Sequence, residues 1–270
     1  MYNCHTHTKH SHDCAATPAD LCEEALRQKL FGFAFTDHCD CEFSDTQDII
    51  LQFENAKNDY ESVLKTYGDR LRLHFGIELG DALYNPAFAS AIISAFDFDV
   101  ILLSVHAVRI AGLDQPFSGI DFSRLPQSDL EKYVMTYYED LLQSVRTFDF
   151  DILAHLTVPL RYIKIKYHRS VPQKAYEPLI RDILKEVIQK DKTLEINTSA
   201  LTLKNGFLMP DRETVQEYLL LGGKSLSLGS DAHTAKNLTA GFSEAVTVLK
   251  QMNVKSLCYY EQRQRVYYDV

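Results

Sequence analysis

Short runs of β-branched, aromatic and other apolar residues alternate along the chain with longer amphipathic stretches, and few folds are compatible with that alternation. Seven of the short runs have the length and composition of buried strands. Strands that are separated by helices pair in parallel, with the helices as crossovers. The pattern therefore predicts an α/β fold built on a parallel sheet. The predicted strands are residues 2–7, 31–38, 71–79, 98–106, 150–155, 193–197 and 224–231.

The amphipathic stretches carry signals for the start of a helix. Thr17 and Pro18 precede the first stretch, and Asp211 follows Pro210 ahead of the last. The tail is rich in Tyr and Val and is expected to add a closing strand or hairpin. Because no Gly/Ser linker, low-complexity tract or repeat interrupts the chain, we predict one domain spanning residues 1–270. The predicted helices are 17–30, 46–66, 86–95, 128–147 and one after Asp211, and the tail is 256–270.

Composition and charge argue against several classes of protein. The 270 residues include 28 Lys and Arg against 37 Asp and Glu, for a net charge of −9. This charge disfavours binding to nucleic acid or to an acidic membrane. No apolar run approaches the roughly 18 residues that span a bilayer, and the N-terminal segment is polar. We therefore expect a cytoplasmic protein without a nucleic-acid or membrane partner. The sequence does not indicate an oligomeric state.

Residues of the types that bind metals stand at the end of almost every predicted strand. His5 and His7 are two residues apart on an extended segment, so both imidazoles face the same side. The carboxyl ends of the strands of a β/α barrel converge on one mouth, which brings together residues distant in sequence. The later strands end at or near His38, Glu78, His106, His155, Glu195, Asp231 and His233.

Such a gathering of polar side chains indicates a metal site. Without a cation, each unsatisfied buried group would cost about 1–3 kcal/mol. Neutral imidazole and carboxylate are ligands of zinc, iron and manganese. The six cysteines contain no CxxC pair, and Cys39 and Cys41, although spaced to bind a soft metal, are interpreted as reduced thiols. His74 and His168 are interpreted as structural or surface residues.

In these motifs the chain resembles the PHP (polymerase and histidinol phosphatase) family of metal-dependent phosphoesterases, and its tail at 234–250 resembles the histidinol-phosphatase branch. Any one motif is weak, whereas seven in order over almost the whole chain are specific. The resemblance implies a distorted (βα)7 barrel, a TIM-like barrel of the PHP type, with two or three divalent metal ions. The motifs are His5-Thr6-His7-Thr8 with Ser11-His12, Thr36-Asp37-His38, Gly76-Ile77-Glu78, Ser104-Val105-His106, Ala154-His155-Leu156, Glu195-Ile196-Asn197-Thr198-Ser199 and Gly229-Ser230-Asp231-Ala232-His233.

The resemblance also implies which residues bind each metal. Glu78 would bridge the first two ions, and the family match favours His12 over His10 as a ligand of the third. The metal stays open among zinc, iron and manganese, because all three suit such ligands. The implied ligands are His5, His7, Glu78 and Asp231 for the first ion, Glu78, His106 and His155 for the second, and His12, His38 and His233 for the third.

Two positions depart from the family pattern. Asn3 stands where the family commonly has Asp, two residues before the first ligand, which predicts neutral surroundings for His5. Thr157 follows Leu156 where relatives have an acidic residue. Asp37 is interpreted as a structural residue or as one that supports a ligand.

The implied reaction is the hydrolysis of L-histidinol phosphate, a small phosphate monoester, in histidine biosynthesis. Metals that share Glu78 would hold a bridging water whose pKa falls from ~15.7 to ~7, and its hydroxide would attack phosphorus. Glu78 and Asp231 are the expected catalytic carboxylates. Arg161 is the preferred cation for the phosphate oxygens, ahead of Arg109. Further expected substrate contacts are Asn197 and Ser199 on the pocket wall, and the acids Asp13, Asp40, Glu42 or Asp114 for the positive groups of the substrate.

Three other functions are compatible with the same residues. An amidohydrolase-like enzyme also has His-x-His on its first strand and a final Asp, but needs fewer ligands than this chain offers. Another phosphoesterase of the same family, acting on phosphotyrosine or nucleotides, would use the same metal ligands. A cluster that only stabilises the barrel is the third alternative, although barrel mouths are where open coordination positions are found.

Overall fold

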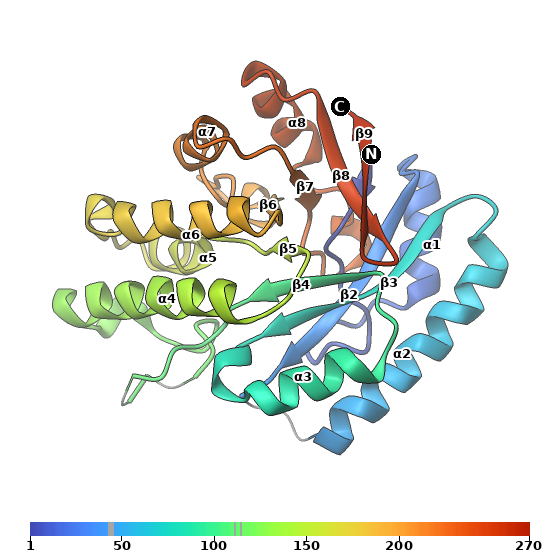
Figure 1. Ribbon diagram of the computed structural model, residues 1–270, viewed down its shortest axis with the longest axis horizontal. Coiled ribbons are helices and arrows are strands. Elements are labelled where there is room, and N and C mark those ends of the chain that lie inside the picture. Colours follow the sequence, from blue (N-terminus) through green and yellow to red (C-terminus); the bar gives the residue numbers. More distant parts are fainter. Residues whose placement is uncertain (43–45, 111, 114) are drawn as a thin grey trace.

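Seven parallel strands pair in the order in which they occur along the chain (Figure 1). This computed structural model describes residues 1–42, 46–110, 112–113 and 115–270. Seven-stranded parallel pairing with helical crossovers confirms the predicted (βα)7 barrel. The strands are β1 (Tyr2–Asn3), β2 (Gly32–Asp40), β3 (Arg72–Gly80), β4 (Val100–Ser104), β5 (Ile152–Leu153), β6 (Thr193–Asn197) and β7 (Leu226–Gly229).

The first and last strands meet and close the barrel. The Cys4 amide donates to the Leu228 carbonyl at 2.8 Å. Beyond the strand ends, the Asp231 amide donates to the His5 carbonyl at 2.9 Å, and the His7 amide to the Ala232 carbonyl at 3.0 Å. The closing seam is therefore also the place where residues from the two ends of the sequence meet at the mouth.

Helices cover the outside of the barrel, as the helix-start signals predict. Thr17 caps the first helix by a capping box with Asp20, and the Asp211 side chain accepts the Thr214 amide. The helices are α1 (Pro18–Arg27), α2 (Thr46–Tyr67), α3 (Pro86–Ala95), α4 (Gln127–Thr147), α5 (Val158–Leu160), α6 (Glu177–Gln189), α7 (Arg212–Leu220) and α8 (Phe242–Gln251). Single 3-10 turns span Ala82–Tyr84, Phe122–Arg124, Gln173–Ala175, Ser199–Thr202 and Ala235–Asn237, and a π-helical turn spans Arg161–Lys166.

Alternate residues of a strand point to opposite sides of the barrel wall. On β2, Phe33 and Phe35 pack in the core between the barrel and its helices, whereas Ala34 belongs to the core inside the barrel. The buried residues of α2 recur every three or four positions, which is the period of a helix face, and Phe53 among them meets the Phe98 ring at 5.5 Å. The outer core is therefore rich in large aromatic residues, whereas the smaller inner core combines Ala34 with Leu102, Ile152 and the ring of Tyr2.

A C-terminal hairpin, β8 (Ser256–Glu261) and β9 (Gln264–Asp269), packs against the amino ends of the barrel strands (Figure 1). Tyr259 stacks on Tyr2 with ring centroids 4.4 Å apart, and the Tyr2 hydroxyl lies 2.5 Å from His74 Nδ1. The Tyr260 hydroxyl bonds to Thr193 Oγ1 at 2.8 Å. The predicted hairpin is thus confirmed as a plug in the amino end of the barrel, and His74 has the structural role expected of it.

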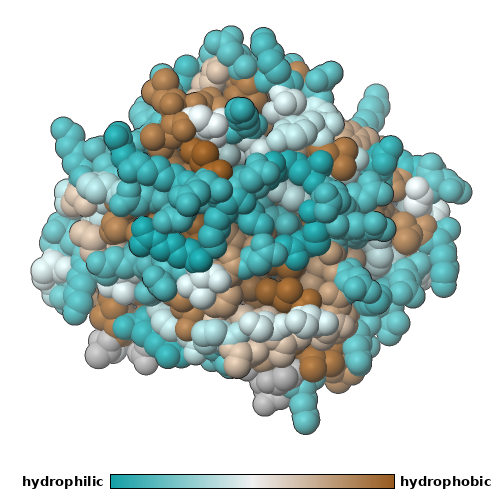
Figure 2. Space-filling model, viewed as in Figure 1, coloured by the Kyte–Doolittle hydropathy of each residue, from teal (hydrophilic) through white to brown (hydrophobic). Residues whose placement is uncertain are grey.

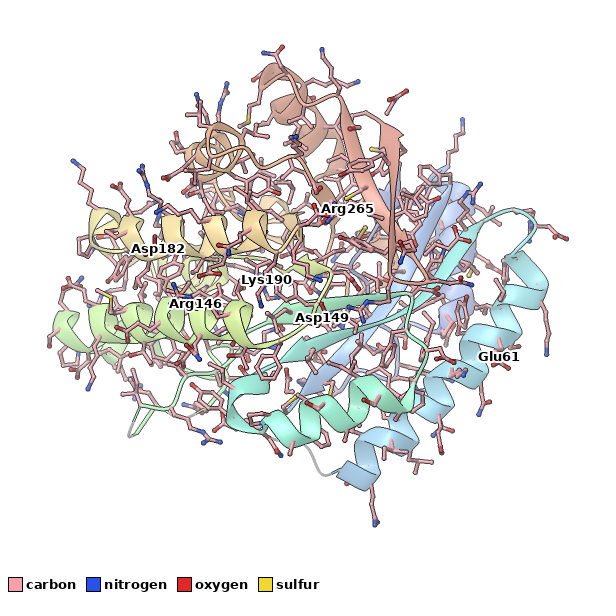
Figure 3. The ribbon with its side chains drawn as sticks, viewed as in Figure 1. Glu61, Arg146, Asp149, Asp182, Lys190 and Arg265 are labelled. Atoms are coloured by element: carbon pink, nitrogen blue, oxygen red, sulfur yellow. The ribbon has the colours of Figure 1, made fainter. Side chains whose placement is uncertain are left out.

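The outer helices present charged side chains on the face seen in Figures 2 and 3, where hydrophobic residues occur only in small groups. Lys190 Nζ donates to the Arg146 carbonyl at 2.7 Å, and Arg146 pairs with Glu186 at 2.7 Å, which ties α6 to α4. Within the described residues, the structure contains no helix with the length and hydropathy needed to span a membrane.

Strands β1, β4, β5 and β7 end earlier at the mouth than predicted, whereas β2 and β3 extend one or two residues beyond their predicted ends and β6 ends as predicted. Strand β4 ends at Ser104, two residues before His106, and β7 ends at Gly229, two residues before Asp231. His155 and Asp231 adopt left-handed backbone conformations with φ of 51° and 52°. Such conformations are uncommon for residues with a side chain and occur in turns and at functional sites.

The plug predicts a large stability loss for Tyr259→Ala. The ring is 4% exposed, and deleting a buried aromatic side chain costs about 3–5 kcal/mol of the free energy of unfolding, measured by denaturant titration. Tyr267→Ala on β9 is the matched control: its side chain is 49% exposed, so we expect a loss of about 1 kcal/mol or less. Equal losses from the two variants would contradict the account of the hairpin as a plug.

Candidate metal centre

The carboxylate of Glu78 lies at the centre of the barrel mouth and is fully buried. One oxygen, Oε1, lies 2.7 Å from His155 Nε2 and 3.0 Å from His106 Nε2. The other, Oε2, lies 2.9 Å from His38 Nδ1 and 3.2 Å from His5 Nε2. His7 Nε2 also lies 3.5 Å from Oε2. Each oxygen therefore faces a different group of imidazoles, which is the arrangement of a carboxylate that bridges two cations.

Four buried polar atoms that face one another in this cluster have no hydrogen-bond partner within the part of the chain that the structure describes. They are His5 Nε2, His7 Nε2, His38 Nδ1 and Glu78 Oε2, although the three nitrogens lie within 3.5 Å of that oxygen. Buried polar groups nearly always have a hydrogen-bond partner, so several unpartnered atoms that face one another need an explanation. Divalent cations would satisfy all four atoms together, and the donor set of imidazole and carboxylate suits such ions.

Asp231 completes a group with His5 and His7. Its Oδ1 lies 3.2 Å from His7 Nε2 and 3.8 Å from His5 Nε2. His5, His7 and Asp231 offer ligand atoms within 4.8 Å of one another, and so do His5, Glu78 and His155. The seam between β1 and β7 therefore brings a carboxylate from the last motif to the two histidines of the first.

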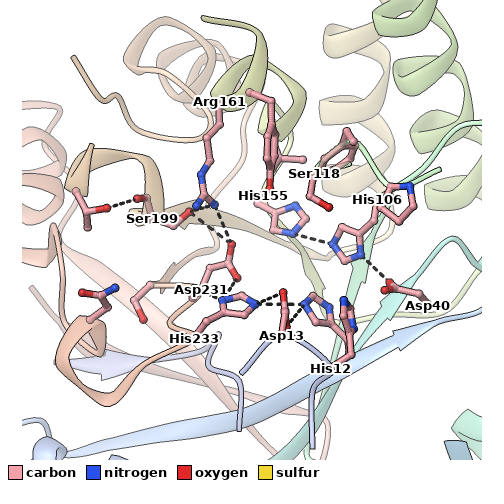
Figure 4. Close-up of a pocket in the computed structure, with 18 of the residues that line it drawn as sticks. His12, Asp13, Asp40, His106, Ser118, His155, Arg161, Ser199, Asp231 and His233 are labelled. Carbon is pink, nitrogen blue, oxygen red and sulfur yellow. Dashed lines mark hydrogen bonds and ion pairs between the residues drawn. The ribbon is translucent and has the colours of Figure 1, made fainter. Parts of the chain in front are cut away.

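A further group lies at the outer edge of the mouth, where His38 Nε2 and His233 Nε2 are 3.4 Å apart. Asp13 faces both, with Oδ2 3.1 Å from His233 Nε2 and Oδ1 3.7 Å from His38 Nε2 (Figure 4). His12 lines the same pocket and its ring centroid is 5.4 Å from that of His38; like Asp13, it is exposed and belongs to none of the ligand groups found among the described residues. The loop thus brings Asp13 to the two imidazoles in addition to the predicted His12.

The local charges keep the central carboxylates ionised. Burial alone would raise the pKa of the Glu78 carboxyl, but the imidazoles of His106, His5 and His38 outweigh burial and hold that pKa well below its usual range. The Asp231 carboxyl is also buried, and its pKa is held well below the usual range by His5, His7 and His233. Both groups therefore offer anionic oxygens at neutral pH.

The histidines are held from behind by polar partners. His5 Nδ1 lies 2.8 Å from Glu195 Oε1, whereas Asn3 Oδ1 accepts the backbone amide of His5. The expectation of neutral surroundings for His5 is therefore wrong, because a carboxylate from β6 reaches the ring. Asp37 accepts hydrogen bonds from the Thr8 amide and from the Ser11 hydroxyl, and that hydroxyl lies 3.1 Å from His7 Nδ1.

A pocket of about 300 Å³ opens over the centre (Figure 4). Arg161, at the start of the π-helical turn, points into this pocket. Its Nη1 donates to Ser199 Oγ at 3.1 Å and lies 3.8 Å from Asp231 Oδ2. Beside Arg161, whose guanidinium carbon lies 5.7 Å from the centroid of the Tyr162 ring, Phe117 and Tyr162 form an aromatic wall with ring centroids 5.3 Å apart. Two of the predicted substrate contacts, Arg161 and Ser199, are thus brought together beside the candidate ligands.

Other predicted contacts lie elsewhere. Arg109 is exposed, pairs with Glu42 at 2.9 Å and stacks over the Tyr84 ring, so neither Arg109 nor Glu42 is among the described residues that line the pocket. Asn197 is buried behind Ser199 and accepts its amide and hydroxyl, which corrects the expectation that Asn197 lines the pocket. Asp13 and Asp40 do line it. Asp114 lies outside the described residues.

Comparisons with known proteins identify the family and the fold of the chain. The profile of the PHP domain family matches residues 3–199. The chain is 28% identical to the probable histidinol-phosphatase of Thermotoga maritima, over 95% of this chain and 94% of that one. It is 26% identical to the histidinol-phosphatase of Lactococcus lactis, over 94% and 91%. The crystal structure of the Lactococcus lactis histidinol phosphate phosphatase, complexed with zinc, L-histidinol and phosphate, matches with a TM-score of 0.80 at 22% identity, covering 98% of each chain.

Because Glu78 would be a ligand of two ions, its substitution should weaken metal binding and, with it, the stabilisation of the fold by metal. Zinc at 100 times its Kd should raise the free energy of unfolding by about 2.7 kcal/mol, because it binds the folded state. Glu78→Gln removes the anionic bridge and should abolish most of that gain, measured by denaturant titration with and without zinc. Equal stabilisation of the variant and the parent protein would show that Glu78 is not a shared ligand.

Proposed function

The chain belongs to the PHP domain family, and on that premise we propose that it is a histidinol-phosphatase that hydrolyses L-histidinol phosphate to L-histidinol and phosphate. The observation that carries the proposal is the buried Glu78 carboxylate with imidazoles at both oxygens, below a pocket that contains Arg161. The relatives named histidinol-phosphatase match over nearly their whole length, and a structure of the same fold carries zinc, L-histidinol and phosphate. These likenesses support the substrate as well as the chemistry.

The ligand groups divide around Glu78. The first comprises His5, His7 and Asp231, and the second comprises His106 and His155; Glu78 would serve both. We place Asp13 with His38 and His233 in a third group, in the role that the sequence pattern assigns to His12. The zinc in the related structure supports zinc here, and the mixed nitrogen and oxygen donors are also suitable for iron or manganese.

Divalent ions at these positions would supply Lewis acidity and lower the pKa of water to about 7, which provides a nucleophile at neutral pH. Glu78 and Asp231 act in the reaction by holding those ions through anionic oxygens. The strained backbone at Asp231 aims its side chain into the mouth while its amide remains bonded to the barrel seam. No side chain needs to form a covalent bond to phosphorus.

Arg161 is the cation for the phosphate group. Its guanidinium lies next to Asp231, and the Ser199 hydroxyl bonds to it, so the group is already oriented beside the proposed ions. A guanidinium donates parallel hydrogen bonds to two phosphate oxygens and stabilises negative charge that develops there. The wall made by Phe117 and Tyr162 offers flat aromatic surface to the imidazole of histidinol.

A kinetic panel tests the substrate. With the metal-loaded enzyme, we expect L-histidinol phosphate to have the highest kcat/KM for phosphate release among histidinol phosphate, phosphotyrosine and nucleoside monophosphates. The reason is that the pocket is small and places one guanidinium beside the ions. A higher kcat/KM for either of the other classes would assign the chain to a different phosphoesterase of the family. Chelation should abolish turnover while circular dichroism remains unchanged, which separates an enzyme from a purely structural cluster.

Substitutions of two adjacent loop residues, Asp13 and His12, test the proposed ligand group that contains His38 and His233. Asp13→Ala should lower the affinity for one ion, because it removes the carboxylate that faces His38 and His233. His12→Ala is the matched control and should leave all ions bound, because the ion pairs to His38 and His233 are made by Asp13. Elemental analysis after dialysis against a graded series of chelator concentrations gives the measurement. Loss of an ion from His12→Ala and not from Asp13→Ala would restore the assignment made from the sequence pattern.

A further inference from the structure

Two carboxylates that are not ligands in the proposed centre each contact one histidine that is. We propose that Glu195 and Asp40 are positioning residues, which hold His5 and His106 with Nε2 directed at the metal ions, and that Gly229 and Gly80 are required to make room for them. The inference rests on the proposed metal centre and adds to it the residues that orient its ligands from both sides of Glu78.

Glu195, on strand β6, is buried and hydrogen-bonded to His5, as a residue that positions a metal ligand must be. Its side chain and that of His5 are both 0% exposed, and His5 Nδ1 donates to Glu195 Oε1 at 2.8 Å. The second oxygen, Oε2, accepts from Asn197 Nδ2 at 3.1 Å. Because a carboxylate only accepts hydrogen bonds, it fixes the hydrogen of the ring on Nδ1 and leaves the lone pair on Nε2. That nitrogen is one of the orphaned atoms beside Glu78.

Asp40 repeats the arrangement on the opposite side of Glu78. It ends strand β2, and its Oδ1 accepts from His106 Nδ1 at 2.7 Å (Figure 4). The other nitrogen of the ring, Nε2, lies 3.0 Å from Glu78 Oε1 and 3.4 Å from His155 Nε2. The two carboxylates thus act on the two proposed ions separately, Glu195 through His5 and Asp40 through His106.

A glycine on the neighbouring strand creates the space for each carboxylate. A Cβ on Gly229 of β7 would overlap Glu195 Oε1 and would press against the Cβ of His5. A Cβ on Gly80 of β3 would overlap Asp40 Oδ1, and Gly80 is paired with Asp40 in the strand register. Neither glycine has a positive φ. The absence of a side chain, and not backbone freedom, therefore accounts for glycine at both positions.

Asp151 is a buried carboxylate in the same barrel whose contacts are purely structural. Asp151, at the amino end of β5, pairs with Arg263 and accepts the Ile101 amide at 2.8 Å. It contacts backbone and a cation, whereas Glu195 and Asp40 contact imidazoles of the proposed centre. Asp151→Asn is therefore the matched control for the loss of a buried carboxylate without an effect on a metal ligand.

The test is titration of the metal-free full-length protein with Co²⁺, followed by the visible absorption of the bound ion. Glu195→Gln and Asp40→Asn keep the size of each side chain and remove its charge. We expect each to weaken the binding of one cobalt ion by about 10–100-fold and to change the cobalt spectrum, as loss of such partners does in other metal sites. Asp151→Asn should reduce stability and leave the cobalt affinities and the spectrum unchanged.

Unchanged cobalt affinities and spectra in folded Glu195→Gln and Asp40→Asn would overturn the inference while leaving the metal centre in place. An equal effect of Asp151→Asn would overturn it as well, since the effect would then be structural. If Glu195→Gln does not fold, Asp40→Asn decides the matter, because Asp40 lies at the edge of the pocket with its side chain 13% exposed. A parent protein that binds no cobalt would overturn both proposals. Weakened cobalt binding by an enzyme that is inactive on histidinol phosphate would refute only the proposed substrate.

Discussion

The interaction on which the rest of this structure depends is the approach of five imidazoles to one buried carboxylate, Glu78. Glu78, His5 and His7 in this cluster are fully buried, and several of its polar atoms have no hydrogen-bond partner among the described residues. Desolvated polar groups of this kind destabilise a fold unless a cation or hydrogen bonds compensate for them. The proposed ions provide that compensation, so stability of the mouth and catalysis would depend on the same bonds.

The barrel separates its two ends by function. Its amino end is filled by the Tyr2 and Tyr259 rings, which supply apolar burial and close off the interior. Its carboxyl end carries the polar cluster, together with strained backbone at His155 and Asp231. Apolar packing at the amino end stabilises the barrel and so offsets the cost of burying the polar cluster at the carboxyl end. The same division is general for β/α barrels, whose active sites lie at the carboxyl ends of the strands.

Sequence reasoning succeeded where regular strand geometry decides the outcome. The spacing of His5 and His7 and the position of Glu78 near the end of β3 were enough to predict their meeting at one mouth. It failed where a loop path or a side-chain contact decides. The turn after His7 brings Asp13 to His233, a contact that the sequence pattern does not indicate, and Arg109 bonds to Glu42 outside the pocket. The bond between Glu195 and His5 depends on the register of β6 and β7, which no local pattern reveals.

The measurement that tests the central claim most directly is anomalous X-ray scattering from crystals grown with zinc. The account predicts a zinc peak on each side of the Glu78 carboxylate, about 2.0–2.2 Å from its oxygens and about 2.0–2.1 Å from the imidazole nitrogens that face them. Glu78 would then be seen to join two ions. Electron density that shows these side chains clustered as described, with no anomalous peak among them at saturating zinc, would contradict it.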